Sequence, residues 1–317
     1  MLPIRLDRPN SAQKIMNPTP LTLVNDASNG HFTLKYYNPP EGLERYILAL
    51  FDLQWDEANM ESRHPGNTGL LHLTIEGEGE FRFPDRVDKA VPGPYIFNAF
   101  DVATPYTLKG PWRCLGASLS PYGWAALTQA PVDQHKNRFF PAADLLGNDI
   151  NTFCDDLIAR LLSGEIGGAE ACGAVANWIG DRLQPIPVDH EVLIEKVLAW
   201  LGSSLNPQVD DLRESLGYSR RQVERLVKRY FGFPPRGLAR KFRALRTANL
   251  LIQPEMTDEG AAEIAEAFVD QPHMIRELRR FCGFTPSRLE GHEDTLFLKL
   301  TEVKNLNRLA PYKDIGV

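Results

Sequence analysis

The stretch SRRQVERLVKRYFGFPP, residues 219–235, places five basic side chains within about three turns of a predicted helix. Apolar positions repeat in it at i, i+3, i+4 and i+7, namely at Val223, Leu226, Val227 and Tyr230. This repeat predicts a helix with one buried stripe. Ser219 suits the N-cap, and Gly232 followed by two prolines ends the helix. The basic side chains are therefore expected to lie largely on its exposed side.

A second short helix is predicted immediately before this stretch. VDDLRESLGYS, residues 209–219, carries an apolar stripe and reaches Gly217, which suits a left-handed helix end. Two short helices that meet at a glycine turn form the helix-turn-helix pattern. The basic helix would fit the major groove of DNA, where arginine pairs with guanine and glutamine with adenine. Neighbouring cations would neutralise phosphates, which makes such binding salt-dependent.

The basic helix has an internal copy about 51 residues downstream, in DQPHMIRELRRFCGFTP at residues 270–286. Arg225 aligns with Arg276, and Gly232 with Gly283. Between the copies, residues 235–254 predict a connecting helix with a basic face opposite its apolar stripe of Leu238, Phe242, Leu245 and Ala248. If the two units are rigidly joined, they address two major-groove segments about one helical turn apart.

These residues resemble the paired helix-turn-helix domain of AraC/XylS transcription regulators over Pro207 to Leu289, about a quarter of the chain. The most specific pieces are LGYS at 216–219, the Asp-Gln-x-His opening at 270–273 and GFTPSRL at 283–289. Ala267 stands where such proteins usually have glycine, which leaves open whether the second unit contacts bases. The candidate DNA-binding residues are Ser219, Arg220, Arg221, Gln222, Arg225, Lys228, Arg229, Gln271, His273, Arg276, Arg279 and Arg280.

The first half of the chain has a different pattern. β-like runs at 45–55, 68–83, 93–100 and 114–120, separated by Gly, Pro and Asp breaks, predict an antiparallel β-sandwich or barrel. The family resemblance implies that this is a cupin-like barrel, which binds an effector or mediates dimerisation. Its aromatic residues are expected mainly in the core, with a pocket lining as the alternative. They are Tyr46, Phe51, Trp55, Phe83, Tyr95, Phe97, Phe100, Tyr106 and Trp112.

A barrel of this type can also be an enzyme. A metal-dependent cupin would need clustered His and Glu ligands. The candidates are His64, His72, Glu76, Glu78 and Glu80. No HxH pair exists, and the glycines between the glutamates favour a solvated edge, so neither a metal site, a cofactor nor a catalytic residue is expected.

Cysteine chemistry is the other enzymatic alternative, because DNA-repair methyltransferases carry a similar regulatory domain. Those proteins need an activated cysteine and a zinc-bound cysteine cluster. The four cysteines, Cys114, Cys154, Cys172 and Cys282, form no close pair. We therefore expect buried, reduced thiols.

The strand-like first half and the helical second half predict an α+β multidomain chain. Its 317 residues are 43% hydrophobic and 24% charged, with a net charge of -6. We divide it into a cupin-like domain (20–120), a helical linker (121–203), an AraC-type DNA-binding domain (204–290) and a tail (291–317). The linker contains three amphipathic helices, at 149–164, 169–187 and 189–204, the first with a stripe of Phe153, Leu157, Ile158, Leu161 and Leu162. Since no apolar run nears the roughly 20 residues of a membrane span and no signal segment is visible, a cytoplasmic location is expected.

The resulting hypothesis is a sequence-specific DNA-binding transcription regulator with a sensing or dimerising barrel. Its partner is double-stranded DNA, and a small-molecule effector, RNA polymerase and a second copy of the chain are further candidates. The acidic remainder would limit indiscriminate association with DNA. The alternative is a cupin-type small-molecule-binding protein or enzyme whose helical domain mediates protein contacts.

Overall fold

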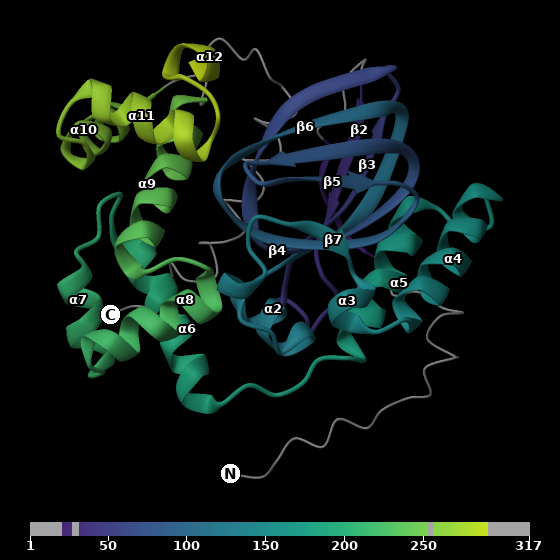
Figure 1. The fold of residues 1–317 in the computed structure, drawn as a ribbon, viewed down its shortest axis with the longest axis horizontal. Helices are drawn as coiled ribbons and strands as arrows, with labels where there is room; N and C mark the ends of the chain where they lie inside the picture. The colour runs from purple at the N-terminus through teal and green to yellow at the C-terminus, as the bar shows by residue number, and fades with distance from the viewer. Residues whose placement is uncertain (1–20, 27–31, 253–255, 291–317) are drawn as a thin grey trace.

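The protein was analysed as a computed structural model, which describes residues 21–26, 32–252 and 256–290; the expected tail at 291–317 lies outside them. An antiparallel barrel forms the first half, and helices follow (Figure 1). The strands are β1 (Leu23–Asp26), β2 (Phe32–Tyr37), β3 (Ile47–Trp55), β4 (Asn59–Phe83), β5 (Arg86–Ala90), β6 (Gly93–Leu119) and β7 (Phe139–Pro141). The predicted antiparallel barrel is thus confirmed.

Two long strands close the barrel. β4 and β6 lie next to each other in the sheet order β1-β2-β3-β6-β4-β5 and pair along most of their length. Leu70 of β4 pairs with both Phe97 and Ser118 of β6, so β4 lies between the two ends of β6. The runs predicted at 93–100 and 114–120 are therefore two ends of one bent strand, whose register shifts allow the curvature.

The helices that follow the barrel include the predicted periodic segments, and they also include two helices that the periodicity did not indicate, at 121–128 and 143–146. They are α2 (Pro121–Thr128), α3 (Ala143–Leu146), α4 (Asp149–Leu162), α5 (Gly168–Gly180), α6 (Val188–Ser203), α7 (Val209–Leu216), α8 (Arg220–Phe231), α9 (Pro235–Leu251), α10 (Asp258–Ala267), α11 (Gln271–Phe281) and α12 (Pro286–Glu290). Within the described residues, none of these helices has both the length and the apolar character needed to cross a membrane.

The predicted stripe of α4 was partly wrong. Its buried residues are Ile150, Cys154, Leu157 and Leu161, whereas Leu162 is 62% exposed. The stripe is rotated because α4 packs against α5 and β6 with the face that carries Ile150, Cys154, Leu157 and Leu161, which leaves Leu162 outside the contact.

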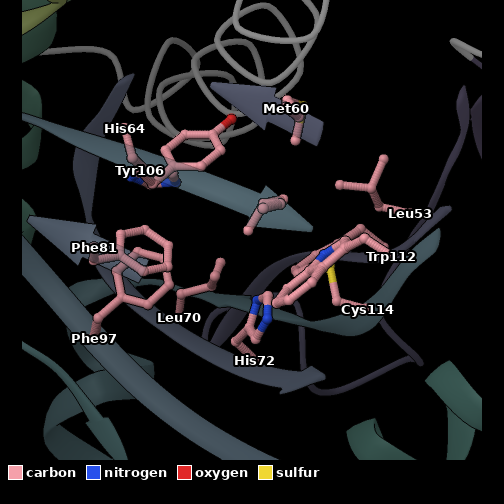
Figure 2. Close-up of a pocket in the computed structure, with 12 residues that line it drawn as sticks. Leu53, Met60, His64, Leu70, His72, Phe81, Phe97, Tyr106, Trp112 and Cys114 are labelled. Carbon is pink, nitrogen blue, oxygen red and sulfur yellow. The ribbon is translucent and has the colours of Figure 1, made fainter. Parts of the chain in front are cut away.

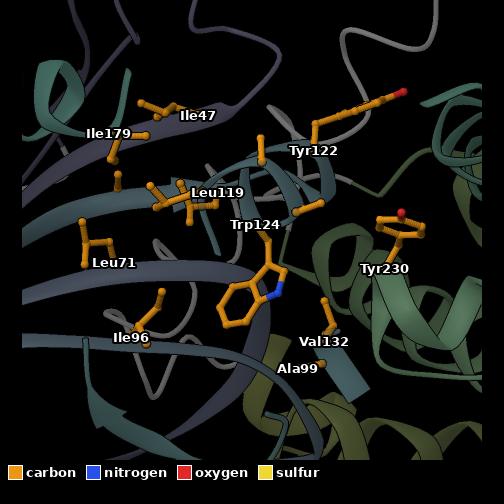
Figure 3. Close-up of a cluster of buried hydrophobic side chains, with 14 of the residues drawn as sticks. Ile47, Leu71, Ile96, Ala99, Leu119, Tyr122, Trp124, Val132, Ile179 and Tyr230 are labelled. Atoms are coloured by element: carbon orange, nitrogen blue, oxygen red, sulfur yellow. The ribbon is translucent and has the colours of Figure 1, made fainter. Parts of the chain in front are cut away.

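One hydrophobic core joins the barrel to the first helix-turn-helix unit. Trp124 of α2 is fully buried between barrel residues such as Leu119 and the short 3₁₀ turn η1 (Val132–Gln134). Figure 3 shows the same cluster continuing to Tyr230 of α8, whose hydroxyl lies 2.6 Å from Nδ1 of His190 on α6. The second unit has a separate core, to which α9 and α11 both contribute. The first unit is therefore held on the barrel by apolar burial as well as by its own helices.

Candidate nucleic-acid interface

The first helix-turn-helix unit consists of α7, a glycine turn and α8. Gly217 ends α7 with a φ of 66°, which a residue with a side chain rarely adopts. Ser219 caps α8: its Oγ accepts a hydrogen bond from the backbone N–H of Gln222, whose Oε1 accepts one in return from the backbone N–H of Ser219. With Val223 and Leu226 buried below, the opposite side of α8 faces solvent.

The second unit, α10 and α11, repeats this arrangement with one difference. Asp270 caps α11 by accepting a hydrogen bond from the backbone N–H of His273 at 2.6 Å. However, α10 ends at Phe268 in extended backbone rather than at a left-handed glycine. Phe268 is buried and lies edge-on to the ring of His273, so an aromatic contact positions this turn.

Both recognition helices present free cations. In α8 the exposed ones include Arg221, Arg225 and Lys228, and in α11 they are Arg276, Arg279 and Arg280. Among the residues that the structure describes, no ion pair is formed by any of these six. Ser219, Arg220, Gln222 and Gln271 are also exposed, and Arg229 and His273 are half-buried. The structure thus places all twelve candidate residues on α8, α11 or the N-cap of α8.

Some of the twelve candidates already bind other residues within the protein, among them Ser219, whose Oγ accepts the hydrogen bond that caps α8. Gln222 completes the capping box of α8. Arg220 pairs with Glu224, with 3.2 Å between Nε and Oε1, and His273 lies 3.2 Å from Oε1 of Glu277. The periodicity of the sequence indicates which side of a helix is exposed, but it does not identify these local partners. Gln222 and His273 therefore help to position the recognition helices.

The prediction that the basic residues of the connecting helix α9 form an exposed face was wrong for two of them. Lys241 and Arg243 are buried, at 5% and 7% exposure. Nζ of Lys241 donates hydrogen bonds to the carbonyl oxygens of Pro65 at 2.7 Å and Phe100 at 2.8 Å, both in the barrel wall. These contacts satisfy a charge that would otherwise be costly to bury. Lys241 therefore ties α9 to the barrel.

Arg243 binds a carboxylate that the sequence analysis did not single out. Glu277 of α11 accepts hydrogen bonds from Nη2 of Arg243 and from Nε of Arg240, both at 2.7 Å. Burial alone would raise the pKa of Glu277, but these two charged hydrogen bonds hold it below its ordinary value. The only feature of the sequence that could have indicated this role of Glu277 is that it is an acidic residue within a basic helix. This cluster holds α11 on α9.

The barrel contains a small apolar cavity of about 60 Å³ (Figure 2). Its lining includes Leu53, Met60, Leu70, Phe81 and Leu108. Among the expected aromatic residues, Phe51, Phe97, Tyr106 and Trp112 line it, whereas Phe83, Tyr95 and Phe100 belong to the surrounding buried cluster. Both alternatives for the aromatic residues, core and pocket lining, therefore apply to part of the set.

The metal-ligand candidates lie on two sides of the barrel wall. His64 and His72 line the cavity, whereas Glu76 and Glu78 are exposed to solvent. Within the described residues, no group of three or more His, Cys, Asp or Glu side chains is arranged to hold a metal ion. All four cysteines are buried.

The cavity is close to the contact with α9. His64 accepts a hydrogen bond from the backbone N–H of Gly66 through Nδ1 and lies edge-on to the ring of Phe100, 5.8 Å between centroids. Lys241 binds the carbonyls of Pro65 and Phe100, which are the residues next to or in contact with His64. One residue layer thus separates the cavity from α9 of the helical half.

Comparison with known proteins supports the assignment of the helical half. Residues 212–291 match the model of the family described as "Helix-turn-helix domain". The HTH-type transcriptional regulator GbdR of Pseudomonas aeruginosa (strain UCBPP-PA14) is 24% identical over 188 residues, covering 55% of this chain and 49% of that protein. The HTH-type transcriptional regulator ArgR of Pseudomonas aeruginosa is 30% identical over 147 residues, covering 41% and 44%.

Among solved structures, ToxT from Vibrio cholerae aligns with 76% of this chain and 97% of its own, at 9% identity and a TM-score of 0.46. The chain spans about half the length of the curated relatives it matches. Both capped helices, α8 and α11, lie within residues 212–291, so this part of the chain carries a helix-turn-helix domain.

Proposed function

We propose that this protein is a sequence-specific DNA-binding transcription regulator that reads two adjacent major-groove segments, one with α8 and one with α11. The observation that carries the proposal is the pair of capped helices with unpaired exposed cations. Arginine at such positions can bind guanine with two hydrogen bonds, and the remaining cations can neutralise phosphates. Two such helices on one connecting helix favour a bipartite site.

The barrel supplies regulation in this proposal. A cavity of about 60 Å³ is below the size of an ordinary ligand site, so a bound effector must displace lining side chains such as His64 or Phe97. Phe97 stacks on Phe100, whose carbonyl accepts a hydrogen bond from Lys241. An effector would therefore shift the population of arrangements of α9 relative to the barrel.

Further partners complete the proposal. We place the protein in the cytoplasm, with RNA polymerase and a second copy of the chain as additional partners and no catalytic activity of its own. The similar proteins GbdR and ArgR are both named as transcriptional regulators, which supports a regulatory rather than an enzymatic role.

The test is selection of bound duplexes from a random pool by the purified protein, repeated at two salt concentrations. Wild type should enrich a motif with two half-elements about one helical turn apart. Arg225→Ala should lose or change one half-element, and Arg276→Ala the other, if each residue reads a base.

Other outcomes of the selection are equally informative. A single enriched element, lost in Arg225→Ala but unchanged in Arg276→Ala, would restrict base reading to the first unit. Absence of enrichment and of salt-sensitive binding would overturn the proposal and favour the small-molecule-binding alternative.

A further inference from the structure

A groove of about 750 Å³ separates the two recognition helices. Its lining includes Arg220 and Glu224 near the start of α8 and His273 near the start of α11. Arg236 and Arg240 line it from the first half of α9, the helix that connects the two units. The groove therefore lies between the helices that, on the proposed function, enter successive major grooves.

The groove is positively charged. Five arginines and two carboxylates line it. Each of the two carboxylates is already paired with one arginine, Asp210 with Arg213 and Glu224 with Arg220. The remaining arginines are Arg236, Arg240 and Arg243. Among the described residues, Arg240 and Arg243 form ion pairs with the same carboxylate, that of Glu277. An excess of positive charge is therefore left on the α9 side.

Arg236 is the free cation of this surface. It is exposed, and within the described part of the chain no ion pair involves it. Arg240 is bound to Glu277 through Nε, yet its side chain is 43% exposed. Arg243 is buried and also donates to the carbonyl of Ala267, so it is not available to a ligand.

A duplex whose successive major grooves hold α8 and α11 passes over this groove between them. Between two successive major-groove segments on one face of the duplex, the minor groove and the phosphate backbones that border it face the protein. Phosphates there would meet Arg236 and the exposed part of Arg240. We infer that this groove is a third DNA-contact surface, which binds the backbone between the half-elements through Arg236, an inference that rests on the proposed function.

The first test measures affinity against salt for the selected duplex. If Arg236 neutralises one phosphate, Arg236→Ala should reduce the slope of log affinity against log salt by about 0.9. The affinity ratio of wild type to variant should then fall about 3.5-fold between 50 and 200 mM salt. The loss should be the same for selected and random duplexes, and Arg236→Lys should largely restore binding. Arg86→Ala, on barrel strand β5, is the matched control and should leave the slope unchanged.

The second test locates the contact. A duplex with neutral methylphosphonates between the two half-elements should bind wild type more weakly than the unmodified duplex. Arg236→Ala should show a smaller difference between the two duplexes than wild type does, since one of the two cations that meet those phosphates is gone and Arg240 remains. If the modification weakens both proteins by the same factor, Arg236 does not contact this backbone and the inference is wrong.

The two proposals fail differently. If wild type binds no duplex in a salt-dependent way, the proposed function fails. If wild type binds and Arg225→Ala weakens binding, but Arg236→Ala leaves the salt slope unchanged, only the groove inference fails.

Discussion

Glu277 of α11 and Arg243 of α9 form a buried ion pair, with 2.7 Å between Oε2 and Nη2 and side-chain exposures of 2% and 8%. Arg243 also stacks over the ring of Phe268 and donates to Asn206. The second recognition helix is thus attached to the connecting helix by charge as well as by apolar contacts. Glu277 supplies the charged part of this attachment, and the apolar core shared by α9 and α11 supplies the rest.

Removal of that carboxylate should destabilise the helical half. Glu277→Ala leaves the buried Arg243 without its partner, and such a loss typically costs about 3–5 kcal/mol. Glu224→Ala removes an exposed carboxylate from the other recognition helix and should change stability by less than about 0.5 kcal/mol. Urea unfolding of both variants measures the difference. Equal stabilities for the two variants would contradict the assigned role of Glu277.

The same pair predicts a pH dependence. Because the pKa of Glu277 is lower in the folded than in the unfolded protein, its ion pair contributes fully above the ordinary carboxyl pKa of about 4.3. That contribution is lost as the pH falls through the folded-state pKa. Wild type should therefore be more stable than Glu277→Gln at pH 7, and the two should converge in acid. A stability difference that persists unchanged at pH 3 would refute this.

Two glycines with similar backbone angles should respond differently to substitution. Gly217 and Gly232 both have positive φ, at 66° and 79°, so alanine costs about 1–2 kcal/mol of backbone strain at either. At Gly217 the added Cβ meets open space, whereas at Gly232 it comes within 2.9 Å of Cβ of Ala99. Gly232→Ala should therefore be the more destabilising in thermal unfolding. Ala99→Gly in the same chain should recover part of the difference.

Lys241→Met tests the link between α9 and the barrel. The methionine fills similar space but leaves the carbonyls of Pro65 and Phe100 without this donor, at about 1–3 kcal/mol for an unsatisfied group. Lys228→Met, at an exposed position of α8, should change stability by less than about 0.5 kcal/mol. Guanidinium unfolding gives both values. Indistinguishable variants would show that Lys241 does not hold the two halves together.

The thiols should be unreactive in the folded protein. All four are buried, and burial raises the pKa of Cys282 to about 12 despite the opposing charge of Lys241. A disulfide reagent at pH 8 should label no cysteine rapidly in native conditions and all four in denaturant. Fast labelling of Cys282 in the native protein would contradict its burial.

The helical half was largely predictable because its signals are local. The helix start at Ser219, the stop at Gly232 and the buried stripe of Val223 and Leu226 depend on residues within one helix. The internal copy was recognisable for the same reason, since Asp270 and Gly283 hold the equivalent places in α11. The barrel was predictable as a class, but its closure by two long strands was not, because strand pairing joins distant residues.

The sequence by itself determined which segments become helices or strands and which cations of α8 and α11 face outward, since hydrogen bonding and periodicity within a segment decide both. Only the tertiary structure decided the roles of Lys241, Arg243 and Glu277. Lys241 binds carbonyls 141 and 176 residues away, and Arg243 lies 34 residues from Glu277. A charge that appears solvated in a periodic pattern is buried when such a distant partner meets it. The groove beside Arg236 has the same origin, because it exists only once α8, α9 and α11 are packed.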